Sequence, residues 1–231
     1  MEKILSICTP LFNQWAYTKS YLKDLSRLPN NNEIILVDNG STDETQRQLE
    51  TSKEVIYFRS EVNKGFGWGS NKAMSLSSAP NILFLNNDIK VRERHENWTD
   101  ELLKYCGDHI VGPTMGQLDK DFNFVQEANR ELTGLSYMSG WCFCASKKLL
   151  LKLNIPRKEK DEMYQVFDDN SFFCYYEDSD LSFRARKQHI PFKIVSIPVI
   201  HFGKRSSRQL NVSELYNNSR LIFINKWKNK V

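Results

Sequence analysis

Short apolar runs alternate with segments of helical pattern over the first 90 residues, and this alternation limits the possible folds more than any other feature. Apolar residues recur at helical spacing over residues 15–28, and Ser41 begins a segment with an N-cap residue and two acids. Such alternation predicts a parallel sheet with helices on both faces. The expected strands are residues 4–8, 34–37, 55–58 and 82–85.

Polar residues follow three of these runs, namely Thr9, Asp38 with Asn39, and residues 86–88. Ligands of open α/β sheets bind at the carboxyl ends of the strands, so these side chains are expected to converge at a site. Asp88 could ligate a divalent cation that holds a diphosphate, although an ordinary turn also favours Asn and Asp.

The second half of the pattern is looser. A glycine-rich bend is expected at residues 65–69, between the expected strand at 55–58 and the expected helix at 71–78. The other expected elements are helices at 71–78, 98–105, 146–153, 180–188 and 213–228, a hairpin over 115–125, and strands at 137–145 and 192–195.

Three acids, Glu177, Asp178 and Asp180, lie beside aromatic residues and ahead of a basic helical segment. Crowded carboxylates next to apolar rings gain proton affinity, which suits a general base that accepts a hydroxyl proton near neutral pH. Helix capping explains an acid in this position equally well, especially Asp180. His201 ends another apolar run and is either structural or a ligand for a metal such as manganese.

The bulk composition excludes several classes of protein. The longest apolar runs of this 231-residue chain fall far short of the roughly 20 residues that cross a bilayer, so no transmembrane segment is expected. The five cysteines lack zinc-type spacing, and Cys142 and Cys144 are expected to pack in the core. With no signal-peptide pattern, a cytoplasmic location is expected.

Positive charge is concentrated at the carboxyl end, where Glu214 is the single acid after Phe202. Such a segment can bind DNA, an anionic membrane surface or phosphate. Trp227 lies between two lysines, an arrangement that could also stack a nucleic acid base. A solvated terminal helix explains the same charges. The cations are Lys204, Arg205, Arg208, Arg220, Lys226, Lys228 and Lys230.

Several motifs in order resemble the inverting glycosyltransferases of family 2, especially the rhamnosyltransferase-like branch, over nearly the whole chain. The motifs are SICTPLFN (6–13), ILVDNGSTD (35–43), NKGFG (63–67) with Asn71, FLNND (84–88), SGW (139–141), YEDSDLSFR (176–184) and His201. The resemblance implies an α/β GT-A fold, with a Rossmann-like, mostly parallel central sheet flanked by helices and a smaller acceptor-side β region. It implies one domain over 1–231, with a nucleotide-sugar half (1–110) and an acceptor and catalytic half (111–231).

The resemblance also implies roles for individual residues. Asp178, with Glu177, would be catalytic, Asp88 and His201 would bind Mn²⁺ or Mg²⁺, and Gly140, Trp141 and Arg205 would contact the acceptor or sugar. The residues implied for the donor nucleotide are Thr9, Pro10, Phe12, Asp38, Asn39, Ser41, Asn63, Gly65, Asn71 and Asn87. The motif at 86–88 keeps only the last carboxylate of the family's Asp-x-Asp, so modest metal affinity is expected.

The implied reaction is a single displacement that inverts the anomeric carbon of a UDP-, dTDP- or GDP-linked sugar. The acceptor hydroxyl would belong to a glycan, a lipid-linked saccharide, a protein or, less in keeping with the family, a nucleic acid base. A nucleotidyltransferase and a non-catalytic nucleotide-sugar-binding module remain alternatives. A dinucleotide-dependent oxidoreductase is disfavoured, because the glycines at 65–69 follow the third expected strand rather than the first.

Overall fold

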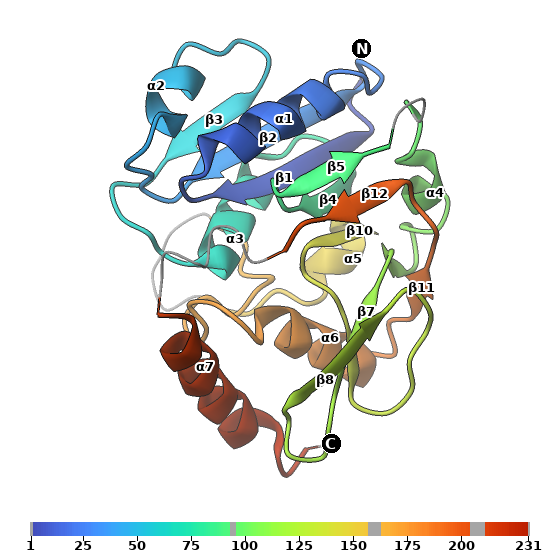
Figure 1. Ribbon diagram of the computed structural model, residues 1–231. Helices are drawn as coiled ribbons and strands as arrows, with labels where there is room; N and C mark the ends of the chain where they lie inside the picture. The colour runs from blue at the N-terminus through green and yellow to red at the C-terminus, as the bar shows by residue number, and fades with distance from the viewer. Residues whose placement is uncertain (1, 93–95, 157–162, 204–210, 231) are drawn as a thin grey trace.

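The computed structural model describes residues 2–92, 96–156, 163–203 and 211–230, and its centre is a seven-stranded sheet of order β11-β6-β10-β4-β1-β2-β3 (Figure 1). All neighbouring pairs are parallel except those of β10, which runs antiparallel to β4 and β6. The sheet is therefore mostly parallel, as predicted. Its strands are β1 (Leu5–Leu11), β2 (Asn32–Asp38), β3 (Ile56–Arg59), β4 (Asn81–Leu85), β6 (Ile110–Gly112), β10 (Cys142–Ser146) and β11 (Phe192–Ile194).

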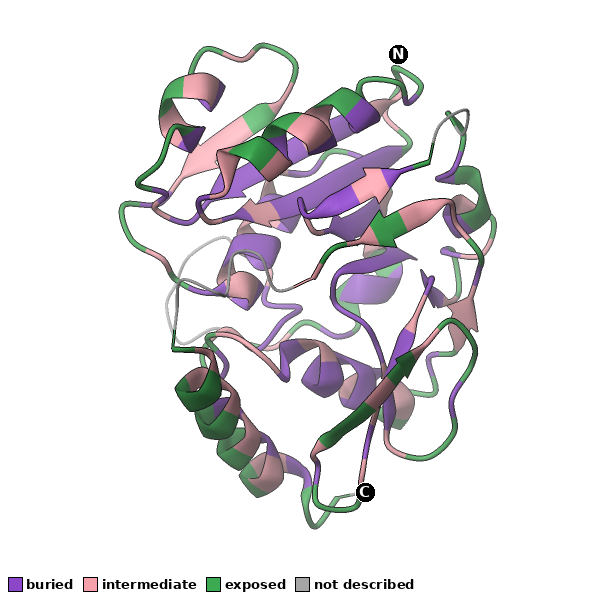
Figure 2. Cartoon of the chain, in the orientation of Figure 1, coloured by how far each residue is buried: buried purple, intermediate pink, exposed green. Residues whose placement is uncertain are grey.

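Helices cover both faces of this sheet, and each face has its own apolar core. On one face α1 packs on β1 and β4 through Tyr21 and Leu25, and on the other α3 packs on β2 through Ala73 and Met74. The central strands of the sheet are mostly buried in Figure 2, which accounts for their apolar runs, whereas the edge strands β3 and β11 are only partly buried. The helices are α1 (Trp15–Leu25), α2 (Thr45–Leu49), α3 (Phe66–Leu76), α4 (Asp100–Leu103), α5 (Lys147–Leu151), α6 (Glu177–Lys187) and α7 (Val212–Trp227).

Two small antiparallel sheets complete the fold beside the main sheet. The three-stranded sheet β8-β7-β9 confirms the expected hairpin, and the pair β12-β5 brings His201 opposite Ile89. A third apolar cluster joins the three-stranded sheet to α6 and α7 through Leu118, Phe183 and Phe223. The strands are β5 (Ile89–Val91), β7 (Met115–Leu118), β8 (Phe124–Ala128), β9 (Ser136–Met138) and β12 (Val199–His201).

Three local predictions were wrong. Residues 66–69 begin α3 instead of forming a bend, because Gly69 lies where a Cβ would meet Pro10 and Asn39 at 2.8 Å, so glycine lets the helix approach the sheet. The strand expected at 137–145 is two strands, interrupted at residues 139–141. The first strand was expected to end at Cys8, but β1 continues through Pro10 to Leu11 beside β2. The pairing of β1 with β4 ends at Cys8, so the N–H that proline lacks is not needed for a hydrogen bond to β4.

The carboxyl-terminal helix confirms the expected element, and Cys142 and Cys144 are buried core residues, as predicted. In the part of the chain that the structure describes, no helix is long and apolar enough to span a membrane.

Candidate active site

A cavity of about 730 Å³ lies at the carboxyl ends of β1, β2 and β4. One side is formed by the end of β1, the start of α3 and the loop after β4, and the other by the three-stranded sheet, the start of α6 and the start of α7. Asp88, Asp178 and His201, which are far apart in the sequence, all line it. This is the position expected for a ligand site in an open α/β sheet.

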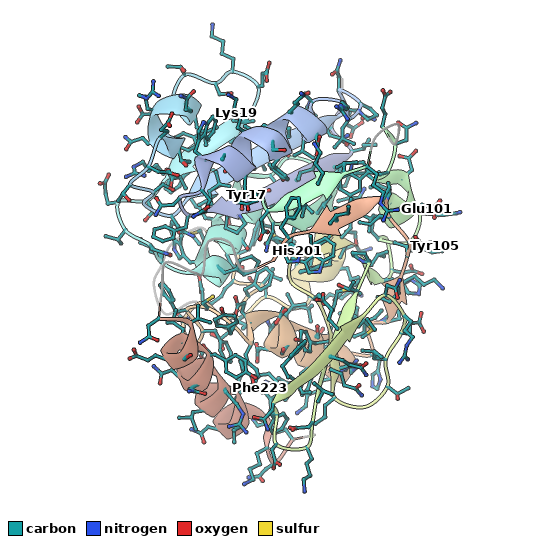
Figure 3. All side chains as sticks on the ribbon, in the orientation of Figure 1. Tyr17, Lys19, Glu101, Tyr105, His201 and Phe223 are labelled. Atoms are coloured by element: carbon teal, nitrogen blue, oxygen red, sulfur yellow. The ribbon has the colours of Figure 1, made fainter. Side chains whose placement is uncertain are left out.

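Asp88 and His201 meet at one edge of this cavity. His201 ends β12, near the centre of the molecule in Figure 3, and its Nε2 lies 3.1 Å from Asp88 Oδ1. The indole of Trp141 stacks on the His201 ring with 4.6 Å between ring centroids and a 10° interplanar angle. The Trp141 indole N–H donates to Thr114 Oγ1 and Glu127 Oε1, both at 2.9 Å, which fixes the ring that supports His201.

The pair offers one carboxylate oxygen and one imidazole nitrogen to a cation. Among the described residues, no three His, Cys, Asp or Glu side chains cluster closely enough to form a complete metal site. Mg²⁺ and similar ions commonly take a few protein ligands and complete their coordination with phosphate oxygens and water. Asp88 and His201 therefore fit a cation that is held jointly with a bound diphosphate.

Two carboxylates, Glu177 and Asp178, face the cavity from the first turn of α6. Asp178 Oδ2 accepts a hydrogen bond from the Gly140 backbone N–H at 2.9 Å, and Oδ1 accepts from the Ser179 N–H at 2.7 Å. Burial raises the pKa of Asp178 to about 6 despite these hydrogen bonds. Burial and the adjacent Asp178 charge also raise the pKa of Glu177, whose Oε2 has no hydrogen-bond partner in the described residues.

The backbone before α6 is held in an uncommon conformation. Tyr175 and Tyr176 both have left-handed φ angles, 71° and 67°. The Tyr176 hydroxyl donates to the Phe122 carbonyl at 2.7 Å, which anchors this turn to the loop between β7 and β8. Strained residues of this kind persist where surrounding contacts fix them, often at functional sites. Here the turn presents both carboxylates to the cavity.

Six of the donor residues implied by the resemblance line the cavity, namely Pro10, Phe12, Asn39, Asn63, Gly65 and Asn87. The Asn39 amide donates to the Gly65 carbonyl at 3.1 Å, and its Oδ1 has no hydrogen-bond partner within the described part of the chain. Gly65 has φ 92°, and a Cβ there would collide with the Phe173 carbonyl. Glycine is therefore required where the donor side meets the loop before α6.

The other four donor candidates, Thr9, Asp38, Ser41 and Asn71, are absent from the described cavity lining. The Thr9 hydroxyl lies 2.5 Å from the Tyr21 hydroxyl in the core. Asp38 accepts from the Tyr57 hydroxyl, the Arg59 guanidinium and the Ser41 N–H. The Asn71 side chain bonds the backbone at Val166 and Phe167, and Ser41 Oγ accepts from the Asn13 N–H. As placed, these four side chains support the loops around the cavity.

The remaining candidates divide into three cases. Gly140 contributes its backbone N–H to Asp178, and Trp141 supports His201 while lining the cavity. Arg205, like Lys204 and Arg208, lies outside the described residues. Asp180 has structural contacts, because it pairs with Arg184 and Lys226; it lies in the first turn of α6, but no side-chain hydrogen bond caps this helix among the described residues.

Trp227 is 3% exposed, and its indole N–H donates to Asp180 Oδ1 at 2.8 Å. Lys226 also pairs with Asp168 at 2.6 Å. Stacking of a nucleic acid base on Trp227 would require this buried contact to open, so the structure does not support that role.

Sequence reasoning missed several residues that line the second half of the cavity. Glu127, Phe124, Tyr137 and Tyr216 come from β8, β9 and α7, and none of them belongs to a motif. The one available signal was Phe124, an aromatic residue next to Val125 in a strand that is otherwise polar.

Comparisons with known proteins complete the description of the site. The family model described as glycosyl transferase family 2 matches residues 6–174. No curated protein matches the chain. The fold is similar to that of S. aureus TarS 1-349, with a TM-score of 0.59 and 16% identity over 96% of this chain and 66% of that chain. TarS 1-349 in complex with UDP gives a TM-score of 0.55 and 15% identity over the same shares.

A mannosyltransferase from Pyrobaculum calidifontis, PcManGT in complex with GDP-Man and Mn²⁺, has a TM-score of 0.57 and 13% identity over 84% of this chain and 55% of that chain. The chain thus spans 66% or less of the length of these solved chains. At such low identity, the likeness shows the fold alone.

Proposed function

Because this chain belongs to glycosyl transferase family 2, we propose that it transfers a sugar from a nucleotide diphosphate sugar to an acceptor hydroxyl, with inversion at the anomeric carbon. The fold is the GT-A fold that the motifs predicted, with a mostly parallel sheet flanked by helices and a smaller antiparallel sheet. The rhamnosyltransferase-like branch stays a prediction.

The donor is proposed to be a UDP-, dTDP- or GDP-linked sugar. The similar structures contain UDP in one case and GDP-Man in another, which supports a nucleotide diphosphate. In this chain the nucleoside would lie against Pro10, Phe12, Asn39 and Asn63, on the 1–110 side of the cavity. The 111–231 side, with Asp178 and Trp141, would receive the acceptor.

Asp178 is proposed as the general base. Its position at the cavity wall allows it to take the proton of an acceptor hydroxyl as that oxygen attacks the anomeric carbon opposite the diphosphate. The Gly140 and Ser179 N–H groups orient its two oxygens, and its raised pKa makes it a better proton acceptor than an exposed carboxylate. The adjacent Glu177 is buried and places a second carboxyl group at the same cavity wall as Asp178.

Asp88 and His201 are proposed to hold Mn²⁺ or Mg²⁺. A divalent cation at this edge would stabilise the negative charge that develops on the departing diphosphate. Trp141 orients His201 for this purpose by stacking on it, while Thr114 and Glu127 fix Trp141. The acceptor is proposed to be a glycan, a lipid-linked saccharide or a protein.

The single observation that carries this proposal is the convergence of Asp88, Asp178 and His201 on one cavity at the carboxyl ends of the strands. The test is a panel of UDP-, dTDP- and GDP-sugars, with and without Mn²⁺ or Mg²⁺, scored for nucleotide diphosphate release and for binding by calorimetry. Metal-dependent release of the nucleotide diphosphate with transfer to an added acceptor is expected, and NMR of the product should show inversion.

Release of sugar 1-phosphate in place of the nucleoside diphosphate would indicate nucleotidyl transfer instead. Binding without turnover for any donor and acceptor would favour the non-catalytic module. Absence of both binding and turnover would contradict the proposal.

A further inference from the structure

The second half of the cavity is an aromatic-walled recess beside Asp178, which we call the aromatic lobe. Its walls are Phe124, Glu127, Tyr137, Tyr175, Tyr216 and Asn217. These residues come from four regions of the chain, namely β8, β9, the turn before α6 and the first half of α7. Glu127 links the lobe to the Asp88 and His201 edge, because its Oε1 accepts from the Trp141 indole N–H and Trp141 stacks on His201.

The aromatic rings of the lobe are fixed in place. Tyr216 packs edge-on against Tyr175, with ring centroids 5.8 Å apart, and its hydroxyl accepts a hydrogen bond from the Phe124 N–H at 3.1 Å. The Tyr137 ring lies over Gly116, where a Cβ would collide with it. Rigid aromatic faces lose little conformational entropy when a flat apolar surface binds to them.

Phe124 is the exposed aromatic residue of this wall, with 50% of its surface accessible. A half-exposed phenylalanine beside several tyrosines, inside a concave surface, is typical of a ligand groove rather than of scattered surface residues. The adjacent Val125 is equally exposed, at 54%, but does not line the cavity. The exposed Phe124 side chain therefore lines the cavity, whereas that of Val125 does not.

The described residues of the lobe and its boundary carry acidic groups. Glu127 lies in the lobe and Asp178 at its boundary, whereas no Lys or Arg is among the described residues that line the cavity. A phosphate or sulfate group in the lobe would face these carboxylates without a described cation to neutralise it. A neutral polyol would instead find acceptors in Glu127 and both donors and acceptors in Asn217.

We propose that the aromatic lobe binds the acceptor, and that this acceptor is an uncharged pyranose residue whose C–H face stacks on Phe124 and Tyr216 while one hydroxyl reaches Asp178. This inference rests on the proposed function and narrows its acceptor class. It predicts that a phosphodiester chain binds in the lobe more weakly than a neutral saccharide. The aromatic faces suit the apolar side of a pyranose ring, and the carboxylates suit its hydroxyl groups.

Saturation-transfer NMR on the full chain, with Mn²⁺ and UDP or GDP present, tests this proposal. The probes are the methyl glycosides and β-linked disaccharides of glucose, galactose, mannose, rhamnose and N-acetylglucosamine, together with the 6-phosphates of the hexoses. At least one neutral probe should bind, with the strongest saturation at ring C–H protons, and its 6-phosphate should bind at least about tenfold more weakly.

Phe124→Ala should weaken binding of that neutral probe by about tenfold, and the matched control Val125→Ala should change it less than about twofold. Both variants should keep wild-type affinity for the nucleotide by calorimetry, which separates the lobe from the donor site. Equal effects of the two variants, tighter binding of the phosphorylated probes, or no neutral binder in a chain that binds nucleotide would overturn the proposal. Loss of nucleotide binding in the wild type would instead contradict the proposed function.

Discussion

The donor edge and the catalytic edge of the cavity use their polar side chains differently. At the donor edge, Asp38 accepts three hydrogen bonds and Asn71 bonds the backbone at two residues, so both side chains are committed to the fold. At the catalytic edge, Glu177 has an oxygen without a described partner, and burial raises the pKa of Asp178. Asp38 and Asn71 therefore hold loops in place, whereas burial raises the proton affinity of Glu177 and Asp178, as the proposed proton transfer would require.

Replacement of Asp178 by Asn should have the largest effect. The variant keeps an oxygen for the Gly140 N–H but loses the base, so kcat should fall by about 10²–10⁴-fold. Nucleotide affinity, measured by calorimetry, should stay within about twofold. A variant that keeps more than about a tenth of wild-type kcat would contradict the assignment of Asp178 as the base.

Replacement of Asp38 by Ala should mainly lower stability. The change removes a fully buried carboxylate that pairs with Arg59 at 2.8 Å and leaves the Tyr57 hydroxyl and the Ser41 N–H without their acceptor. The free energy of unfolding, from urea denaturation, should fall by about 3 kcal/mol. Asp108→Ala is the control, since that side chain is 82% exposed, and it should leave the free energy of unfolding nearly unchanged. Equal effects of the two changes would refute the supporting role of Asp38.

Replacement of Gly140 by Ala, unlike replacement of Asp38, should lower turnover more than stability. The new Cβ would lie 3.0 Å from Asp178 Cβ and 3.1 Å from its Oδ2, so the carboxylate must move by a few tenths of an ångström. We expect kcat to fall by roughly tenfold, since small misplacements of a catalytic group are costly. Gly107→Ala is the matched control, because nothing lies within 4 Å of its added Cβ. A kcat near the wild-type value in Gly140→Ala would show that the fit around Asp178 is loose.

Replacement of Trp141 by Phe should have the smallest effect. Phenylalanine keeps a ring against His201 but loses the indole N–H that bonds Thr114 and Glu127. Mn²⁺ affinity, measured by electron paramagnetic resonance with nucleotide present, should weaken by about three- to tenfold. Unchanged Mn²⁺ affinity would mean that His201 does not depend on this support.

The strands β1, β2 and β4 could be predicted because each contains an apolar run that is buried in the sheet. The edge strand β3 is only partly buried, and its apolar run at 55–58 was its signal. The start of α3 could not, since glycine favours a bend locally, and only the close approach of Gly69 to Pro10 and Asn39 explains the helix. The break between β9 and β10 includes Gly140, a glycine that can interrupt a strand, but the bond from its N–H to Asp178, 38 residues away, could not be predicted from local sequence.

The candidate site was predicted where its residues belong to motifs. Asp88, Asp178 and His201 meet in one cavity, although their roles stay predictions. Thr9 illustrates the limit, because a motif gives no information about whether a hydroxyl faces a ligand or, as here, Tyr21. Glu127 and Tyr216 reach the cavity only through tertiary packing of β8 and α7, which no spacing in the sequence encodes.

The pH dependence of kcat/KM tests the central claim, that Asp178 is a base with a raised pKa, most directly. Activity requires the unprotonated carboxylate, so kcat/KM at saturating Mn²⁺ should rise with pH through a midpoint near the pKa of about 6 and then level off. Because the Glu127 charge contributes to raising the pKa of Asp178, Glu127→Gln should move this midpoint to lower pH. A profile that stays flat through pH 6, or a midpoint that Glu127→Gln leaves unchanged, would contradict the account.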